Sequence, residues 1–189
     1  MKDGPVKILV GKQKQHGAMV VEFALVLFML CALFVFVSDL SHQLLVRSQL
    51  DRASFSLVNI LKERTRYYGS MVDGKPVPRF ELSQRDISDM QRLAGRLLDT
   101  PVDDVAISIE AIVDNDIQPA FTSAAFRRLG CVPVSSMVSN RDLVPVENGK
   151  AYPLYRVTLC SPVSSWFAPF MGMKRKNPTV VSSSIMPGR

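Results

Sequence analysis

The chain has 189 residues and a mass of 21.0 kDa, enough for one ordinary domain or for a smaller domain and a membrane segment. Hydrophobic residues make up 47% and charged residues 21%, a composition that excludes wholesale disorder. Two histidines and three cysteines are too few for most metal clusters, so we expect neither a metal nor a cofactor. The net charge is +6, of which residues 1–17 contribute +3, and the remaining excess is too small to favour nucleic-acid binding.

The first element predicted in chain order is an apolar helix over residues 18–37. This segment contains one charged residue, Glu22, and as an α-helix it would be about 30 Å long, enough to cross the hydrocarbon core of a bilayer. Lysines precede it, whereas the charges of residues 38–57 cancel. The positive-inside rule then places the N-terminus in the cytoplasm and the C-terminal part of the chain across the membrane.

The helix is expected to continue well beyond the apolar segment, because residues 18–68 contain no glycine or proline. After Ser38 the sequence becomes amphipathic, and apolar residues recur every three or four positions. The members of this stripe are Val46, Leu50, Ala53, Leu57 and Ile60. The stripe must pack either on the protein's own domain or on a neighbouring helix, and the sequence leaves both possibilities open.

The remainder of the chain predicts an α+β domain with a short helix and a small antiparallel sheet. Residues 69–82 are typical of a loop. Ser83 and Asp86 form a variant of the capping box, and the helix they begin has one apolar face, made of Ile87, Met90, Ala94 and Leu97. Alternation predicts a half-buried strand over residues 105–113, and two further strands are predicted at 151–160 and 179–186.

Three further features of the sequence have a structural interpretation. The membrane topology would export Cys131 and Cys160 to an oxidising compartment of a bacterial cell, where a disulfide would constrain the unfolded chain by about 3–4 kcal/mol. Two buried free thiols are the alternative. Cys31 lies inside the apolar segment and is expected to be one more apolar side chain. The aromatic residues of segment 166–170 are expected to cap the core, with contact to a partner as the alternative.

The order of residues at the start of the apolar segment resembles the prepilin processing site of type IV pilins. Basic residues are followed by Gly17, by Glu22 five places later, and by an unbroken apolar helix, whereas Gly11 has no acid at the matching distance. The resemblance implies that a prepilin peptidase cuts between Gly17 and Ala18. It also implies that Glu22 pairs with the new α-amino group of a neighbouring subunit and so sets the register between helices.

Residues 17–27 are similar to the TadE/TadF-type pseudopilins of the tight-adherence (Tad/Flp) pilus system. Residues 50–68, and the segment from Tyr155 to Cys160 with Cys131 as its partner, fit the TadF branch. In the major Flp pilin a tyrosine follows the glutamate, but Phe23 follows it in this chain. Together with the large C-terminal domain, this difference favours a minor pilin over the main subunit of the filament.

This resemblance implies a division of the chain and a set of partners. Residues 1–17 would be a basic prepilin leader, 18–37 a transmembrane, pilin-like helix, 38–68 its amphipathic continuation, and 69–189 a periplasmic α+β domain. The expected partners are the prepilin peptidase, a TadE-type pseudopilin, the Flp major pilin and the inner-membrane assembly platform. The expected location is the bacterial inner membrane, or the pilus after assembly, and the expected process is cell adhesion and biofilm formation.

Three alternatives to a pilin-like protein are also compatible with parts of the sequence. A secretory signal peptide is disfavoured by the length of the apolar segment and by Glu22. An uncleaved single-pass scaffold or sensor would retain the leader. A secreted enzyme is the third alternative, but both histidines, His16 and His42, precede the C-terminal domain, which excludes a Ser-His-Asp or Cys-His site within that domain. We therefore expect a protein without enzymatic activity.

Overall fold

The computed structural model describes residues 16–67, 70–72, 75–77, 79–167, 172 and 179–188. The helices in this part of the chain are α1 (His16–Tyr67), α2 (Gln84–Leu98) and α3 (Ala124–Leu129), with the 3-10 helices η1 (Val102–Asp104) and η2 (Val138–Leu143). The strands are β1 (Ser70–Val72), β2 (Lys75–Val77), β3 (Ala106–Val113), β4 (Asp116–Ile117), β5 (Phe121–Thr122), β6 (Val146–Glu147), β7 (Lys150–Ala151), β8 (Leu154–Pro162) and β9 (Thr179–Pro187).

The centre of the domain is a five-stranded antiparallel sheet. Its order is β4-β3-β8-β9, and β5 also pairs with β3. The longest ladder joins β8 to β9, from Leu154 opposite Pro187 to Pro162 opposite Thr179. With α1 and α2 on the same chain, this sheet confirms the predicted α+β class. The strand predicted at 151–160 begins later than expected, because Ala151 belongs to the separate strand β7.

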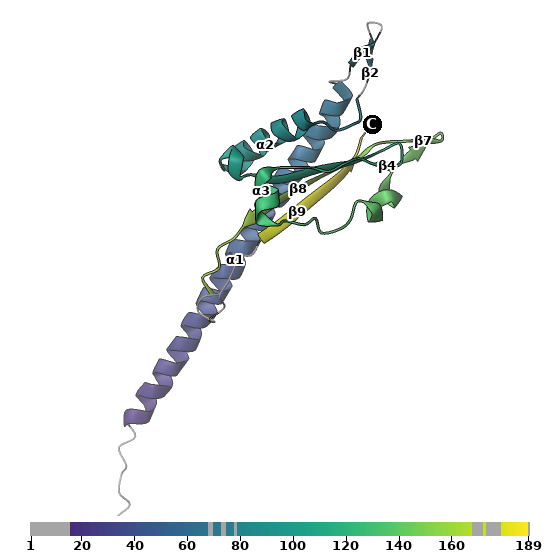
Figure 1. Ribbon diagram of the computed structural model, residues 1–189. Coiled ribbons are helices and arrows are strands. Elements are labelled where there is room, and N and C mark those ends of the chain that lie inside the picture. The colour runs from purple at the N-terminus through teal and green to yellow at the C-terminus, as the bar shows by residue number, and fades with distance from the viewer. Residues whose placement is uncertain are drawn as a thin grey trace, which may run out of the picture.

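α1 is one uninterrupted helix whose first half extends beyond the domain (Figure 1). Its second half packs on β8, β9 and α2 of the same chain, which settles where the predicted apolar stripe lies. Leu50 and Leu57 are buried as expected, but Ile60 is 41% exposed and Leu61 is buried instead. Leu61 is eleven residues from Leu50, close to three full turns, so it returns to the same side of the helix.

Both faces of the sheet are covered by other parts of the chain. On one face, Ile107, Ile109 and Val157 belong to the core that includes residues of α1 and α2. On the other face, Ala106 packs with residues of α3, and Ile112 packs with Met137. The strand predicted over 105–113 is confirmed as β3, but its expected half-buried pattern is wrong, because the segment that follows β5 folds over the second face.

α2 begins as its capping box predicts. The Asp86 carboxylate accepts hydrogen bonds from the backbone N–H and the hydroxyl group of Ser83, at 2.8 and 2.7 Å. The predicted inward face is wrong at its last member, since Leu97 is 53% exposed while Gly95 and Ala94 are buried. The loop predicted over 69–82 is also wrong in part, because β1 and β2 pair within it as a short antiparallel hairpin.

Candidate functional site

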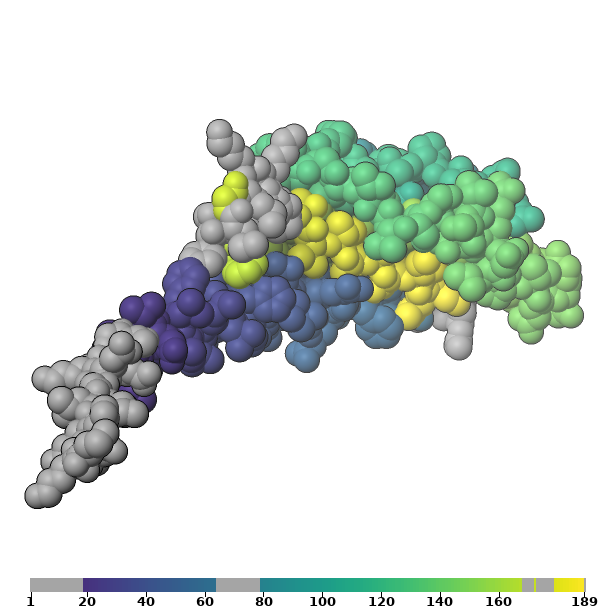
Figure 2. Space-filling model, turned by 90° about the horizontal axis from the view of Figure 1, so that it is seen from below, coloured from purple at the N-terminus to yellow at the C-terminus, as the bar shows by residue number. Residues whose placement is uncertain are grey.

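The exposed half of α1 is the most unusual surface of the molecule. Of the side chains from Met19 to Val37, all but Ala32 and Val35 are exposed, and nearly all are apolar. Figure 2 shows this purple half of the helix projecting away from the domain. It is the one helix among the described residues that is long and apolar enough to cross a membrane. So much exposed apolar surface requires a non-aqueous partner, and it suits the helix for membrane anchoring.

The predicted processing site lies in the first turn of this helix. α1 begins at His16, so Gly17 and Ala18 are already helical, whereas residues 1–15 of the predicted leader lie outside the described part of the chain. Glu22 is four residues after Ala18, about 6 Å further along the axis and on the same side. Phe23, beside Glu22, is exposed.

Glu22 is exposed on an otherwise apolar part of the helix surface. Within the described part of the chain it has no hydrogen-bond or ion-pair partner. A carboxylate that enters an apolar medium is costly unless a cation or hydrogen-bond donors compensate for the lost water. Once other helices or lipid cover this surface, Glu22 therefore needs a partner from outside its own chain, or a position close to water.

Further exposed apolar side chains occur along α1 past the apolar segment. Leu40, Leu44 and Phe55 are spaced by four and eleven residues, so they lie on one side of the helix, and each is about half exposed; the exposed Arg47 and Asp51 lie between them on the same side. This side is about a third of a turn away from the buried side that includes Leu50 and Leu57. The helix thus presents one face to its own sheet and an additional apolar face to a possible partner. We call Leu40, Leu44 and Phe55 the outer stripe.

A short segment after β8 joins the domain to the end of the apolar half of α1. The Asp39 carboxylate accepts a hydrogen bond from the Ser165 hydroxyl group and a second one, at 3.2 Å, from the backbone N–H of Trp166. The ring of Phe167 packs edge-to-face on that of Phe36, with centroids 5.4 Å apart. The expectation that the aromatic segment caps the core is wrong for Trp166, which is 74% exposed; residues 168–170 lie outside the described part.

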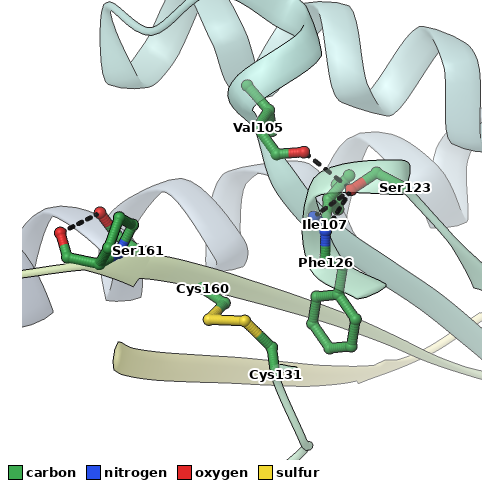
Figure 3. The surroundings of a disulfide bond; sticks show 8 residues. Val105, Ile107, Ser123, Phe126, Cys131, Cys160 and Ser161 are labelled. Carbon is green, nitrogen blue, oxygen red and sulfur yellow. Dashed lines mark hydrogen bonds between the residues drawn. A yellow bond between two sulfur atoms is a disulfide. The ribbon is translucent and has the colours of Figure 1, made fainter. Parts of the chain in front are cut away.

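A disulfide joins Cys131 to Cys160 across the sheet face opposite α1 (Figure 3). It connects the residue that follows the C-cap of α3 to strand β8. Figure 3 also shows how Ser123 fixes the start of α3: its hydroxyl group donates to the Val105 carbonyl at 2.8 Å and accepts from the Phe126 amide at 3.2 Å. The covering segment is therefore tied to the sheet at both ends of α3. Cys31, by contrast, is an exposed free thiol on the apolar half of α1.

A buried ion pair lies on the same sheet face and was not predicted from the sequence. Arg156 on β8 stands opposite Glu110 on β3, and its guanidinium donates to the Glu110 carboxylate and, at 2.7 Å, to the Ser135 carbonyl. The pair holds the segment after the disulfide against the sheet. Opposite charges at facing strand positions would have revealed it, but only once the strand register was known.

Another pair of hydrogen-bonded titratable side chains lies on β6 and in the segment after β7. Glu147 accepts a hydrogen bond from the Tyr152 hydroxyl group at 3.0 Å, and this bond raises the pKa of the phenol. The two residues line an open groove of about 660 Å³ at the end of the sheet far from the apolar half of α1. Among the described residues, no group of three or more His, Cys, Asp or Glu side chains could hold a metal ion.

The comparisons with known proteins give one match. The model of the family TadF, described as "Putative tight adherence pilin protein F", matches residues 11–189, nearly the whole chain. No curated protein and no solved structure matches the chain significantly.

Proposed function

We propose, from the premise that the chain belongs to the TadF family of tight adherence pilin proteins, that it is a minor pilin or pseudopilin that helps to assemble a tight-adherence (Flp-type IVb) pilus. It would be made as a prepilin in the bacterial inner membrane and cut by a prepilin peptidase between Gly17 and Ala18. Its partners would be a TadE-type pseudopilin, the Flp major pilin and the inner-membrane assembly platform. The α+β domain would lie in the periplasm.

The observation that supports this proposal best is the division of α1 into an uncovered apolar half and a half fixed on the domain. A single membrane anchor needs only the first half. The outer stripe, however, places exposed apolar side chains past the membrane segment as far as Phe55, with the exposed charges of Arg47 and Asp51 between them. These side chains suit packing against parallel helices of other subunits, both inside the bilayer and above it.

Processing at Gly17 gives Glu22 a chemical role in that packing. Glycine has no Cβ, so a protease can approach the peptide bond closely. The cut removes the basic leader and creates a positively charged α-amino group on Ala18. Glu22 of one subunit would then pair with the amine of a neighbour shifted along the helix axis. Because the carboxylate is otherwise uncompensated in an apolar medium, this pairing favours one register over its alternatives.

The proposed role does not include enzymatic activity. The histidines are His16, beside the processing site, and His42, on α1, so the C-terminal domain contains no imidazole base. A large domain and Phe23 after Glu22 both favour a minor component over the repeating subunit of a thin filament.

The decisive measurement is the mature N-terminus of the protein recovered from native membranes. The proposal predicts Ala18, while an uncleaved scaffold would begin at Met1 or Lys2. Gly17→Val should block processing, because a β-branched side chain obstructs the close approach of the protease. Gly11→Val is the matched control and should be processed normally, since no acid follows Gly11 at the required distance.

Glu22→Ala separates processing from assembly. We expect the variant to be cut after Gly17 and to remain in the membrane, but to abolish or strongly reduce piliation. Immunoblots of the membrane fraction measure the first two properties, and counts of surface pili measure the third. Normal piliation by Glu22→Ala would contradict the role given to this carboxylate, without affecting the processing result.

A further inference from the structure

The segment that follows β8 returns to α1 where the apolar half ends. Asp39 is only 8% exposed although it lies two residues after Val37, the last residue of the apolar run. Ser165 and Trp166 cover its carboxylate and donate hydrogen bonds to it. Figure 1 shows this segment running beside α1, away from the sheet. The domain therefore contacts the helix at a second place, well separated from the core around Leu57.

This second contact leaves a large aromatic ring outside. The ring of Phe167 packs on that of Phe36, whereas the indole of Trp166 is 74% exposed. Phe36, Val37 and Leu40 on α1 are also about half exposed. The exposed indole therefore lies next to the end of the apolar half of α1, beside Ser38, Asp39 and His42, whereas Val37 and Leu40 lie on the other side of the helix.

The height of Trp166 along the helix can be estimated from the helical rise. Asp39, to which its backbone is bonded, is two residues beyond Val37, which corresponds to about 3 Å along the axis. Trp166 therefore lies within about one helical turn of the end of the hydrocarbon-spanning segment, at the level of the lipid headgroups. Tryptophan is enriched at this level because its ring is apolar and its N–H can hydrogen-bond.

The surroundings of the indole suit this polar layer. A hollow of about 220 Å³ opens beside it and is lined by Ser38, Asp39, His42, Ser164 and Trp166. The exposed imidazole of His42 and hydroxyl of Ser164 would be poorly placed against the core of a neighbouring subunit or against acyl chains. At a headgroup layer, they remain hydrated.

We propose that residues 164–167 form an interfacial anchor, in which Trp166 inserts into the headgroup layer of the bilayer leaflet on the side of the domain and Asp39 holds it there. This proposal rests on the proposed function in one respect, that α1 spans the membrane. The anchor gives the domain a second attachment to the lipid. It fixes the height and the rotation of the domain over the membrane before the helix is drawn into an assembly.

The chain itself supplies the probe, because Trp166 is its sole tryptophan. The full chain is reconstituted into vesicles of phosphatidylethanolamine and phosphatidylglycerol at a ratio of about 3:1, and flotation establishes that it is in the bilayer. Tryptophan emission is then measured with nitroxide-labelled lipids and with aqueous iodide. We expect quenching by a nitroxide near the headgroup to exceed quenching by one in mid-chain at least about twofold, with weak quenching by iodide.

A matched control moves the tryptophan to the other end of the sheet. Val146 is exposed on β6, close to the Leu154 end of β8. The length of β8 from Leu154 to Pro162, the end from which the segment with Trp166 departs, is about 26 Å. The double variant Trp166→Phe/Val146→Trp should float equally well. Its emission should be quenched strongly by iodide and not by either labelled lipid.

The Asp39→Ala and Ser165→Ala variants test the hold on the segment. Each removes a hydrogen bond that keeps residues 164–167 at this height, so iodide quenching of Trp166 should rise by about twofold or more while flotation is unchanged. Two results overturn the anchor with the chain still in the bilayer: full access of iodide in the unmodified chain, or a blue-shifted emission without lipid quenching, which indicates a protein neighbour. Failure of the unmodified chain to float would instead remove the membrane premise that both proposals share.

Discussion

The ion pair between Arg156 and Glu110 is expected to stabilise the domain through a single buried interaction. The side chain of Arg156 is 1% exposed and that of Glu110 is 14% exposed, so neither charge is well hydrated. Arg156→Met would leave the carboxylate without its cation and would free the Ser135 carbonyl. We expect it to lower the free energy of unfolding by about 3 kcal/mol, at the lower end for buried pairs because Glu110 keeps some contact with water. Denaturant titration measures the loss.

Two further variants make this prediction specific. The ion pair between Arg128 and Asp104 is largely exposed, with side chains 63% and 58% exposed, so Arg128→Met should cost less than about 1 kcal/mol. The double variant Arg156→Met/Glu110→Leu should recover much of the loss, because no buried charge remains unpaired. If the double variant is no more stable than Arg156→Met alone, the pair acts through packing and not through charge.

Single residues were predictable from the sequence where their role is local. Asp86 and Ser83 stand three apart before an apolar run, and their capping interaction depends on nothing else in the chain. The partners of Asp39 and Arg156 could not be predicted in this way. Ser165 is 126 residues from Asp39, and Glu110 is 46 residues from Arg156, so each contact exists only after the sheet has placed distant segments together.

At the scale of the element, α1 combines two apolar faces with different tasks. Leu57 is fully buried against the sheet, and Phe55, two residues away, belongs to the outer stripe and is 55% exposed. We expect Leu57→Ala to lower the free energy of unfolding by about 2–5 kcal/mol through lost contacts and a cavity. Phe55→Ala should change stability by no more than about 0.5 kcal/mol, yet it should reduce piliation. Thermal unfolding and pilus counts measure the two effects.

The opposite pattern would contradict this division of faces. If Phe55→Ala is strongly destabilising, or if it leaves piliation intact while Leu57→Ala leaves the fold intact, the outer stripe is not the face that meets a partner. A charged residue at the same site sharpens the test, because Phe55→Glu adds a desolvation cost to any helix contact but none to a hydrated surface.

The helix itself was predictable from the sequence. A run without glycine or proline and a change from uniform to periodic hydropathy indicated its extent and its two halves. The exact members of the buried stripe were harder to predict. Both Ile60 and Leu61 fit an apolar spacing of three or four residues from Leu57, but only Leu61 lies on the buried side of the helix. The hairpin of β1 and β2 was missed because its three-residue strands are too short for any period to be recognised.

For the whole molecule, the sheet and the two contacts with α1 define a rod attached to one side of a domain. β8 and β9 pack on the second half of the helix, and the segment between them returns to Asp39, so the same connection that joins the two strands also reaches the membrane end. The sequence shows the lengths of these parts but not their pairing. The helix packs on one side of the sheet, and the disulfide-linked segment covers the other side.

The orientation of this rod in the membrane yields the last prediction. With the N-terminus in the cytoplasm, the hairpin of β6 and β7, which includes Val146, would face the periplasm. A cysteine introduced there, Val146→Cys in a Cys31→Ala background, should react in intact cells with a maleimide that cannot cross the inner membrane. Cys131 and Cys160 are bonded to each other and should not react with the maleimide. The Cys31→Ala variant without the Val146 substitution is therefore the control. Labelling only after the inner membrane is opened would reverse the topology, and with it the compartment in which this domain could meet other pilus components.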